Sequence, residues 1–217
     1  MEHIDYVKLK DVSLTCKPSE LIFPSWMDNL DSFSHEFETG KVYAVVSEPG
    51  YGGWALSYLL SGKTKGFTGD IYINDTRITS DSLSSYGGWY LGEGVTRKKN
   101  IFGFKRELTV REQIECAPSN QYSLEELIQL FDLSLTRIER AFRYISNERW
   151  NASTAIGLIY GKQIFCFPYI KDDVKDIIWY RLKYNSAIIK QHKGITIIPV
   201  QSASIVEEFV DEIIYLT

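Results

Sequence analysis

The chain has 217 residues, of which 44% are hydrophobic and 24% are charged. This is the composition of an ordinary globular protein, which excludes extensive disorder and fits one domain with at most a small subdomain. The formal net charge of −4 argues against a nucleic-acid-binding protein, for which a basic surface is expected.

Membrane insertion and metal binding are also excluded by the sequence pattern. No stretch approaches the roughly 18–20 apolar residues that span a bilayer, and the first residues lack the basic start and apolar core of a signal peptide. The cysteines, Cys16, Cys116 and Cys166, are far apart and lack a metal-ligand spacing. We therefore expect a cytoplasmic protein with no direct membrane insertion and no metal site of its own.

The predicted elements alternate between strands and helices. Residues 5–16 and 32–37 alternate apolar and polar side chains, which is typical of half-buried strands, and residues 17–31 between them are irregular. Residues 42–46, 163–167 and 194–200 are continuously apolar, which indicates strands buried on both faces. Other strands are expected at 69–73, 89–91 and 212–216, and helices at 54–61, 108–115, 123–131, 138–144, 152–160, 174–184 and 205–210.

This order predicts the fold class. Buried strands that alternate with helices indicate an α/β fold with a mostly parallel sheet. The two alternating strands at the start predict an antiparallel β subdomain before it. Ser123 with Glu126 three residues later has the pattern of a capping box, which supports a helix start there.

A glycine-rich turn follows the buried strand at 42–46. Strand, glycine turn and helix form the frame of a phosphate-binding loop. Against the pattern G-x-x-x-x-G-K-[ST], Gly52 keeps the second glycine and Gly50 adds another. Ser47 stands at the first glycine, Gly53 at the lysine and Trp54 at the Ser/Thr position, so the turn alone is a weak match.

The whole series of segments resembles the nucleotide-binding domain of ABC transporters. Residues 33–79 are similar to that family's segment from the strand before the phosphate loop to the G-x-I-x-I-x-G hairpin, and Glu93 falls at the Q-loop glutamine. Residues 108–112 (LTVRE) resemble its L-T-V-x-E element, and residues 145–149 (ISNER) an LSGGE-type signature loop that is one residue short. Residues 164–167 resemble the Walker B strand, and residues 194–200 the strand before the switch histidine.

The resemblance implies a P-loop NTPase-like fold in one ABC-ATPase-like domain. Residues 1–92 and 160–217 are expected to form its core, and residues 93–159 the Q-loop region and a short α-helical subdomain. The implied partners are a membrane permease and a second nucleotide-binding domain, in a homo- or heterodimer. The chain would then lie peripherally on the inner face of the cell membrane.

The catalytic positions of the family are mostly changed. Gly53 cannot supply a cation to the phosphates, and Trp54 cannot supply a hydroxyl to Mg²⁺. Pro168 and Tyr169 stand at the Walker B carboxylates, and Ser202 at the switch histidine. We therefore assign no catalytic residue and expect ATP and Mg²⁺ to bind weakly, or only at a partner's site.

The signature-like loop consists of Ser146, Asn147 and Glu148. Its serine is retained, so the resemblance implies that a chain without a working loop of its own can still complete the site of its partner. The alternative interpretation of Ser146 is an ordinary N-cap or turn residue.

Other functions and interfaces remain open at this stage. A binding or scaffold protein could keep the fold without transport, and an active ATPase could use Asp172, Asp173 or Lys63 instead of the usual residues.

Four aromatic residues have two possible roles. Phe23 or Trp26 lies where the family places an aromatic ring under the adenine, with packing as the alternative. Phe102 and Phe104 lie near the expected permease contact, where they are either exposed or part of the subdomain core.

Overall fold

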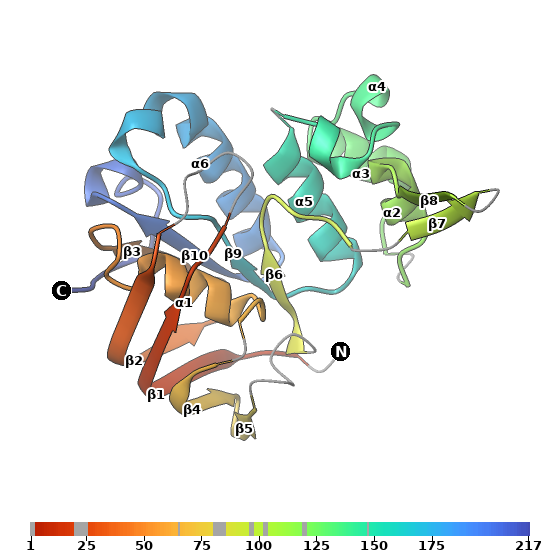
Figure 1. The fold of residues 1–217 in the computed structure, drawn as a ribbon. Helices are drawn as coiled ribbons and strands as arrows, with labels where there is room; N and C mark the ends of the chain where they lie inside the picture. The colour runs from red at the N-terminus through yellow and green to blue at the C-terminus, as the bar shows by residue number, and fades with distance from the viewer. Residues whose placement is uncertain are drawn as a thin grey trace. The chain divides into compact units, whose positions relative to one another are not determined.

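The computed structural model describes residues 3–19, 26–64, 66–79, 86–95, 98–101, 104–118, 121–146 and 148–217. The chain forms two compact units, whose elements are labelled in Figure 1. The first unit combines Met1–Tyr90 with Gln163–Thr217, and the second consists of Leu91–Lys162. The glycine-rich turn therefore belongs to the first unit, and the signature-like loop belongs to the second.

An antiparallel sheet forms one layer of the first unit. Its strands are β1 (Tyr6–Cys16), β2 (Asp28–Glu38), β4 (Thr68–Ile73) and β5 (Thr76–Ile78), in the order β2-β1-β4-β5. The apolar side chains of β1 alternate with exposed polar ones, so one face of this sheet joins the core. The strand expected at 32–37 begins earlier, at Asp28, because the segment expected to be irregular pairs with the end of β1.

A parallel sheet forms the second layer. Its strands are β3 (Val42–Val46), β6 (Gly88–Tyr90), β9 (Ile164–Cys166), β10 (Ile195–Val200) and β11 (Glu212–Tyr215), in the order β11-β3-β10-β9-β6. All four pairings are parallel, and every residue of β9 and β10 is buried. The predicted α/β class, with an antiparallel sheet beside a mostly parallel one, is confirmed.

Helix α1 (Gly53–Leu60) contacts both sheets and ties them together (Figure 1). All of its residues except Tyr58 are buried. Helix α6 (Lys175–Gln191) packs on β10 through Leu182, Ile188 and Ile189. The prediction of a helix at 205–210 is wrong, because the structure has only a 3-10 turn there, at Ala203–Ile205.

The second unit contains a β-hairpin and short helices. Its elements are β7 (Lys98–Ile101), β8 (Phe104–Glu107), α2 (Val110–Glu115), α3 (Leu124–Leu130), α4 (Leu135–Ile138), the 3-10 turn Phe142–Tyr144 and α5 (Arg149–Ile159). The capping box of Ser123 and Glu126 is present at the start of α3. The single helix expected at 138–144 is broken, because Ala141 is extended and forms a β-bridge with Thr109.

Candidate functional site

The glycine-rich turn lies between β3 and α1, at the carboxyl ends of the parallel strands. The Ser47 amide donates to the carbonyl of Val200 at 3.1 Å, which joins the turn to the end of β10. The first turn of a helix leaves backbone N–H groups without intrahelical partners, and such groups attract anions. The frame of a phosphate-binding loop is therefore present.

The start of β2 lies directly against this loop. Gly52 has a left-handed conformation, with φ of 89°, and a Cβ atom placed on it would lie 2.8 Å from the Asn29 carbonyl oxygen and from the Leu30 Cα. The Asn29 amide in turn donates to the Gly50 carbonyl at 3.0 Å. Only glycine fits at position 52, because both its backbone angle and the neighbouring main chain exclude a side chain.

Asp28, which sequence reasoning did not single out, is the acidic group of the site. It is fully buried. One carboxylate oxygen accepts from the Gly50 amide at 2.8 Å and from the Trp26 indole N–H at 3.2 Å, and the other accepts from the Ala55 amide at 2.7 Å. No spacing in the sequence indicates this role, since Asp28 reaches the loop only through the tertiary fold.

At position 53, where the resemblance places the lysine, a side chain would collide with Ser47 in its present conformation. A Cβ atom on Gly53 would lie 2.5 Å from the Ser47 hydroxyl oxygen. Ser47 is 3% exposed, and its hydroxyl has no hydrogen-bond partner among the described residues. A lysine at position 53 therefore requires that Ser47 move first.

Trp54 fills the space beyond the loop instead of presenting a hydroxyl. Its ring is fully buried, and its Nε1 donates to the Tyr90 hydroxyl at 2.6 Å. The ring of Trp26 packs against it with the centroids 4.6 Å apart. A ring in this place offers no oxygen ligand to Mg²⁺.

Pro168 and Tyr169 follow β9, where the resemblance placed the Walker B carboxylates. The Tyr169 hydroxyl donates to the Ser47 carbonyl, and its ring meets that of Trp26 edge-on at 5.4 Å between centroids. Burial raises the pKa of Tyr169, and the nearby Glu48 carboxylate raises it further, so the phenol stays protonated. The side chain acts as a hydrogen-bond donor to the loop.

Asp172, Asp173 and Lys63, which an active ATPase could use in place of the usual catalytic residues, do not form such a site. The Ser202 hydroxyl at the switch position donates to Asp172 at 2.7 Å, and both Asp172 and Asp173 are exposed. The Lys63 ammonium follows the far end of α1, where it lies 5.2 Å from the ring centroid of Tyr58. Among the described residues no group of at least three His, Cys, Asp or Glu side chains could hold a metal ion.

In the second unit, the side chain of Glu148 is fixed by hydrogen bonds and an ion pair to neighbouring residues. It accepts from the Ser134 amide at 2.8 Å and pairs with Arg137 at 2.8 Å. Glu148, and not Ser146, is the N-cap of α5, so of the alternative interpretation of Ser146 as an N-cap or turn residue only the turn fits the structure. Ser146 is exposed, and its carbonyl accepts from the Arg149 amide at 3.4 Å in a turn.

Of the remaining predicted positions, the structure describes Glu93 and Trp26 in full and the others in part or not at all. The Glu93 carbonyl accepts from the Ser153 hydroxyl at 2.6 Å. Asn147, Phe23 and Phe102 lie outside the described residues, and of Phe104 the structure describes the backbone, within β8. The aromatic contacts of Trp26 support its packing role.

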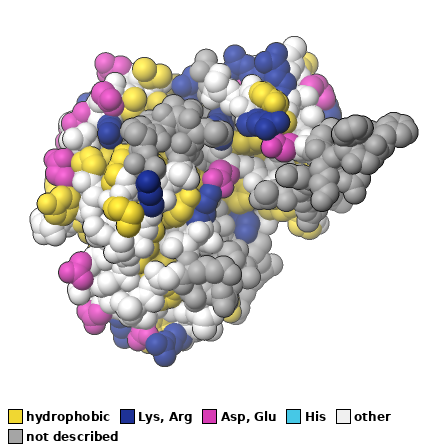
Figure 2. All heavy atoms as spheres, viewed as in Figure 1, with side chains coloured by type: hydrophobic (Ala, Val, Ile, Leu, Met, Phe, Trp, Pro, Cys, Tyr) yellow, Lys and Arg dark blue, Asp and Glu magenta, His cyan; other side chains and the backbone are white. Residues whose placement is uncertain are grey.

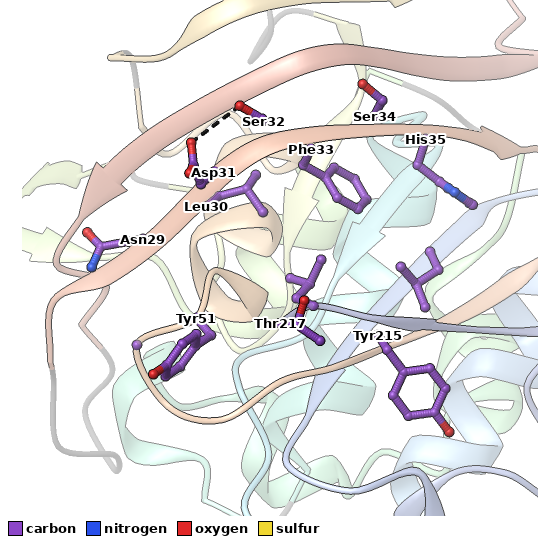
Figure 3. A pocket seen from close by; sticks show the side chains of 13 residues that line it. Asn29, Leu30, Asp31, Ser32, Phe33, Ser34, His35, Tyr51, Tyr215 and Thr217 are labelled. Carbon is purple, nitrogen blue, oxygen red and sulfur yellow. Dashed lines mark hydrogen bonds between the residues drawn. The ribbon is translucent and has the colours of Figure 1, made fainter.

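A pocket of about 800 Å³ lies beside the loop, between the edge strands β2 and β11. Figure 3 shows the side chains of β2 on one side of it and those of Tyr215 and Thr217 on the other. His35 on β2 packs edge-on against Phe37 at 4.7 Å between centroids and lies 3.4 Å from the Glu212 carboxylate. The pocket lining mixes polar side chains, among them those of Asn29, Asp31 and Ser34, with apolar ones such as Leu30 and Phe33.

The surface beyond these sites has mixed charge. On the face in Figure 2, basic and acidic side chains are interspersed among neutral ones over the described part of the chain. No helix in that part is both long and apolar enough to cross a membrane.

Comparison with solved structures identifies the fold. The chain is similar to the dimeric bacterial ABC transporter cassette MJ0796, at 16% identity over 97% of this chain and 94% of that one, with a TM-score of 0.62. It is also similar to the ADP conformation of MJ1267, an ATP-binding cassette of an ABC transporter, at 13% identity over 99% and 88% of the two chains and a TM-score of 0.64. For cbiO1 from Clostridium perfringens, part of the ABC transporter complex cbiONQ, the identity is 12% over 100% and 86%, with a TM-score of 0.64.

The fold is thus that of ABC transporter ATP-binding cassettes, which confirms at the level of fold the resemblance found in the sequence. No protein-family profile and no curated protein matches the chain.

The contact between the loop and β2 can be tested with two glycine variants. Gly40 also has positive φ, but a Cβ atom there meets nothing within 4 Å. We expect Gly40→Ala to cost about 1–2 kcal/mol for the backbone conformation alone, and Gly52→Ala to cost roughly 1–3 kcal/mol more because the main chain of β2 must shift. The measurement is urea unfolding of both variants. Equal losses would show that β2 does not press on the loop.

His35 makes the stability depend on pH. Burial lowers its pKa in the folded chain from the ordinary value of 6.5, against the opposing effect of Glu212. The unfolded chain therefore takes up this proton first, and we expect the free energy of unfolding to fall as the pH drops below about 6.5. His35→Gln should reduce this loss, whereas replacement of His3, whose side chain is 57% exposed, should leave it unchanged. Identical pH profiles of both variants would contradict the prediction.

Proposed function

We propose that this chain is a degenerate ATP-binding-cassette subunit of a bacterial-type ABC transporter, without ATP hydrolysis at its own loop. The observation that carries the proposal is the occupied loop: Asp28 accepts the Gly50 and Ala55 amides, and Tyr169 lies against Ser47. The residues present do not fit Mg·ATP, because two main-chain donors around the loop already bond to Asp28, and the described residues at positions 53 and 54 are a glycine and a buried tryptophan in place of the lysine and the hydroxyl.

The proposed role is structural or regulatory. The subunit would lie at the inner face of the cell membrane, bound to a permease and to a second nucleotide-binding domain, and would transmit motion between them. The likeness to MJ0796, which is dimeric, and to cbiO1, which is part of a transporter complex, supports such partners. Cargo selection would belong to the permease.

The contribution that this chain can make to catalysis is at the signature-like loop. Ser146 is exposed beside the start of α5, whose first turn carries no acidic residue. Its hydroxyl and the helix N-terminus can face the phosphate of a nucleotide that a competent partner holds. The anchored carboxylate of Glu148 fixes the path of the chain at this point.

The isolated chain should not bind nucleotide. We expect calorimetric titration with Mg·ATP to give no saturable heat, because binding would require Asp28 to leave its main-chain donors and Tyr169 to leave Ser47. A cassette with a complete loop, titrated in the same buffer, shows that binding is detectable. A submicromolar, Mg²⁺-dependent affinity would overturn the assignment of the loop as degenerate.

The composite site can be tested in the assembled complex, isolated with the membrane protein and second cassette that co-purify with the chain. Ser146→Arg adds bulk and charge where a partner's phosphate would lie, so we expect it to lower ATP turnover roughly two- to tenfold. Thr136→Arg, at an exposed position of α4, is the matched control and should have little effect. Gly53→Ala is a poor comparison because of the close contact with Ser47.

Two results would contradict the composite site, and a third would contradict the transporter role. Unchanged turnover with Ser146→Arg would show that the chain contributes nothing to a shared site. Equal losses from both arginine variants would indicate a general effect on assembly. Co-purification with no membrane protein at all would favour the scaffold function.

A further inference from the structure

One main-chain N–H group of the loop and one of the helix that follows are hydrogen-bonded to a carboxylate of the same chain. The carboxylate of Asp28 accepts one amide from the loop, Gly50, at 2.8 Å and one from the first turn of α1, Ala55, at 2.7 Å. Loop amides and helix N-termini are the groups that bind phosphate in proteins. Asp28 therefore occupies two of the main-chain donors around the loop, one in the turn and one in the first turn of the helix.

Full burial makes this arrangement energetically demanding. A buried carboxylate is costly unless its charge is compensated by pairing and hydrogen bonds. Among the described residues, no Lys, Arg or His lies within ion-pair distance of Asp28, so the compensation comes from the two amides, the indole N–H of Trp26 and the start of α1. Charge-assisted hydrogen bonds of this kind are stronger than neutral ones.

A second polar group points to an anion site. Ser47 is only 3% exposed, and its hydroxyl has no hydrogen-bond partner among the described residues. The hydroxyl lies against Gly53 at the start of α1. Asp28, from a strand that begins far from the loop in sequence, and Ser47, from the loop itself, thus meet the same helix terminus. The Ser47 hydroxyl is thus a buried donor at this site that bonds to no group among the described residues.

We propose that Asp28 is the resident anion of this loop, a carboxylate that replaces the nucleotide phosphate and holds the loop and α1 in an anion-bound conformation without ATP. The proposal deepens the proposed function, because it explains how a degenerate cassette keeps its loop ordered, but it does not depend on a permease or a second cassette. A phosphate group and the carboxylate compete for the same amides and repel each other. Removal of the carboxylate should consequently leave a small-anion site.

The test is rescue of Asp28→Ala by formate, whose carboxylate is the size of the group removed. We expect the variant to melt at least about 5–10 °C below the parent chain, for the loss of three charge-assisted hydrogen bonds. Formate should then raise its melting temperature saturably. The parent chain and Asp31→Ala, which removes an exposed acid from the same strand, should respond to formate only as they respond to chloride at equal ionic strength.

Asp28→Asn gives a second readout if the alanine variant does not fold. Asparagine keeps the shape but offers one acceptor oxygen, so we expect the amide of Gly50 or Ala55 to exchange with solvent at least tenfold faster than in the parent chain, with no such change in Asp31→Ala. Formate effects on Asp28→Ala no larger than on Asp31→Ala, or unchanged exchange at both amides of Asp28→Asn, would overturn the proposal. Neither measurement involves ATP or a partner, so failure here is separate from failure of the transporter role.

Discussion

The rest of the first unit depends on the hydrogen bonds between one carboxylate and two main-chain amides. Asp28 begins the edge strand of the antiparallel sheet, whereas Gly50 and Ala55 belong to the connection that leaves the parallel sheet. The contact therefore joins both layers at the carboxyl ends of the parallel strands. The left-handed Gly52 allows the two main chains to approach closely enough for these bonds to form.

An aromatic cluster lies at the glycine-rich loop. Trp26, Trp54 and Tyr169 pack together beneath the loop, and their polar atoms bond to Asp28, Tyr90 and the Ser47 carbonyl. Large rings with a single donor suit this place, because they fill space while the donor meets a fixed acceptor. Part of the 14% aromatic content of the chain thus fills the space around the loop.

Sequence patterns predicted the features that depend on local order. The continuous apolar runs at β3 and β10 indicated a parallel sheet, and the residues at positions 53 and 54 indicated a loop without its usual chemistry. Asp28 could not be found in this way, because its main-chain donors, Gly50 and Ala55, lie more than twenty residues further along the chain. The break at Ala141 was hidden for the same reason, since it depends on a bridge to Thr109.

The tight contact between Ser47 and Gly53 ties this position to its neighbours. A substitution that placed lysine at position 53 would bring its Cβ against the Ser47 hydroxyl, while the carboxylate of Asp28 would still accept the Gly50 and Ala55 amides and the buried ring of Trp54 would still follow. A single substitution toward a complete phosphate loop therefore meets the other residues in their present places. Several positions would have to change together before any one of them could favour phosphate binding.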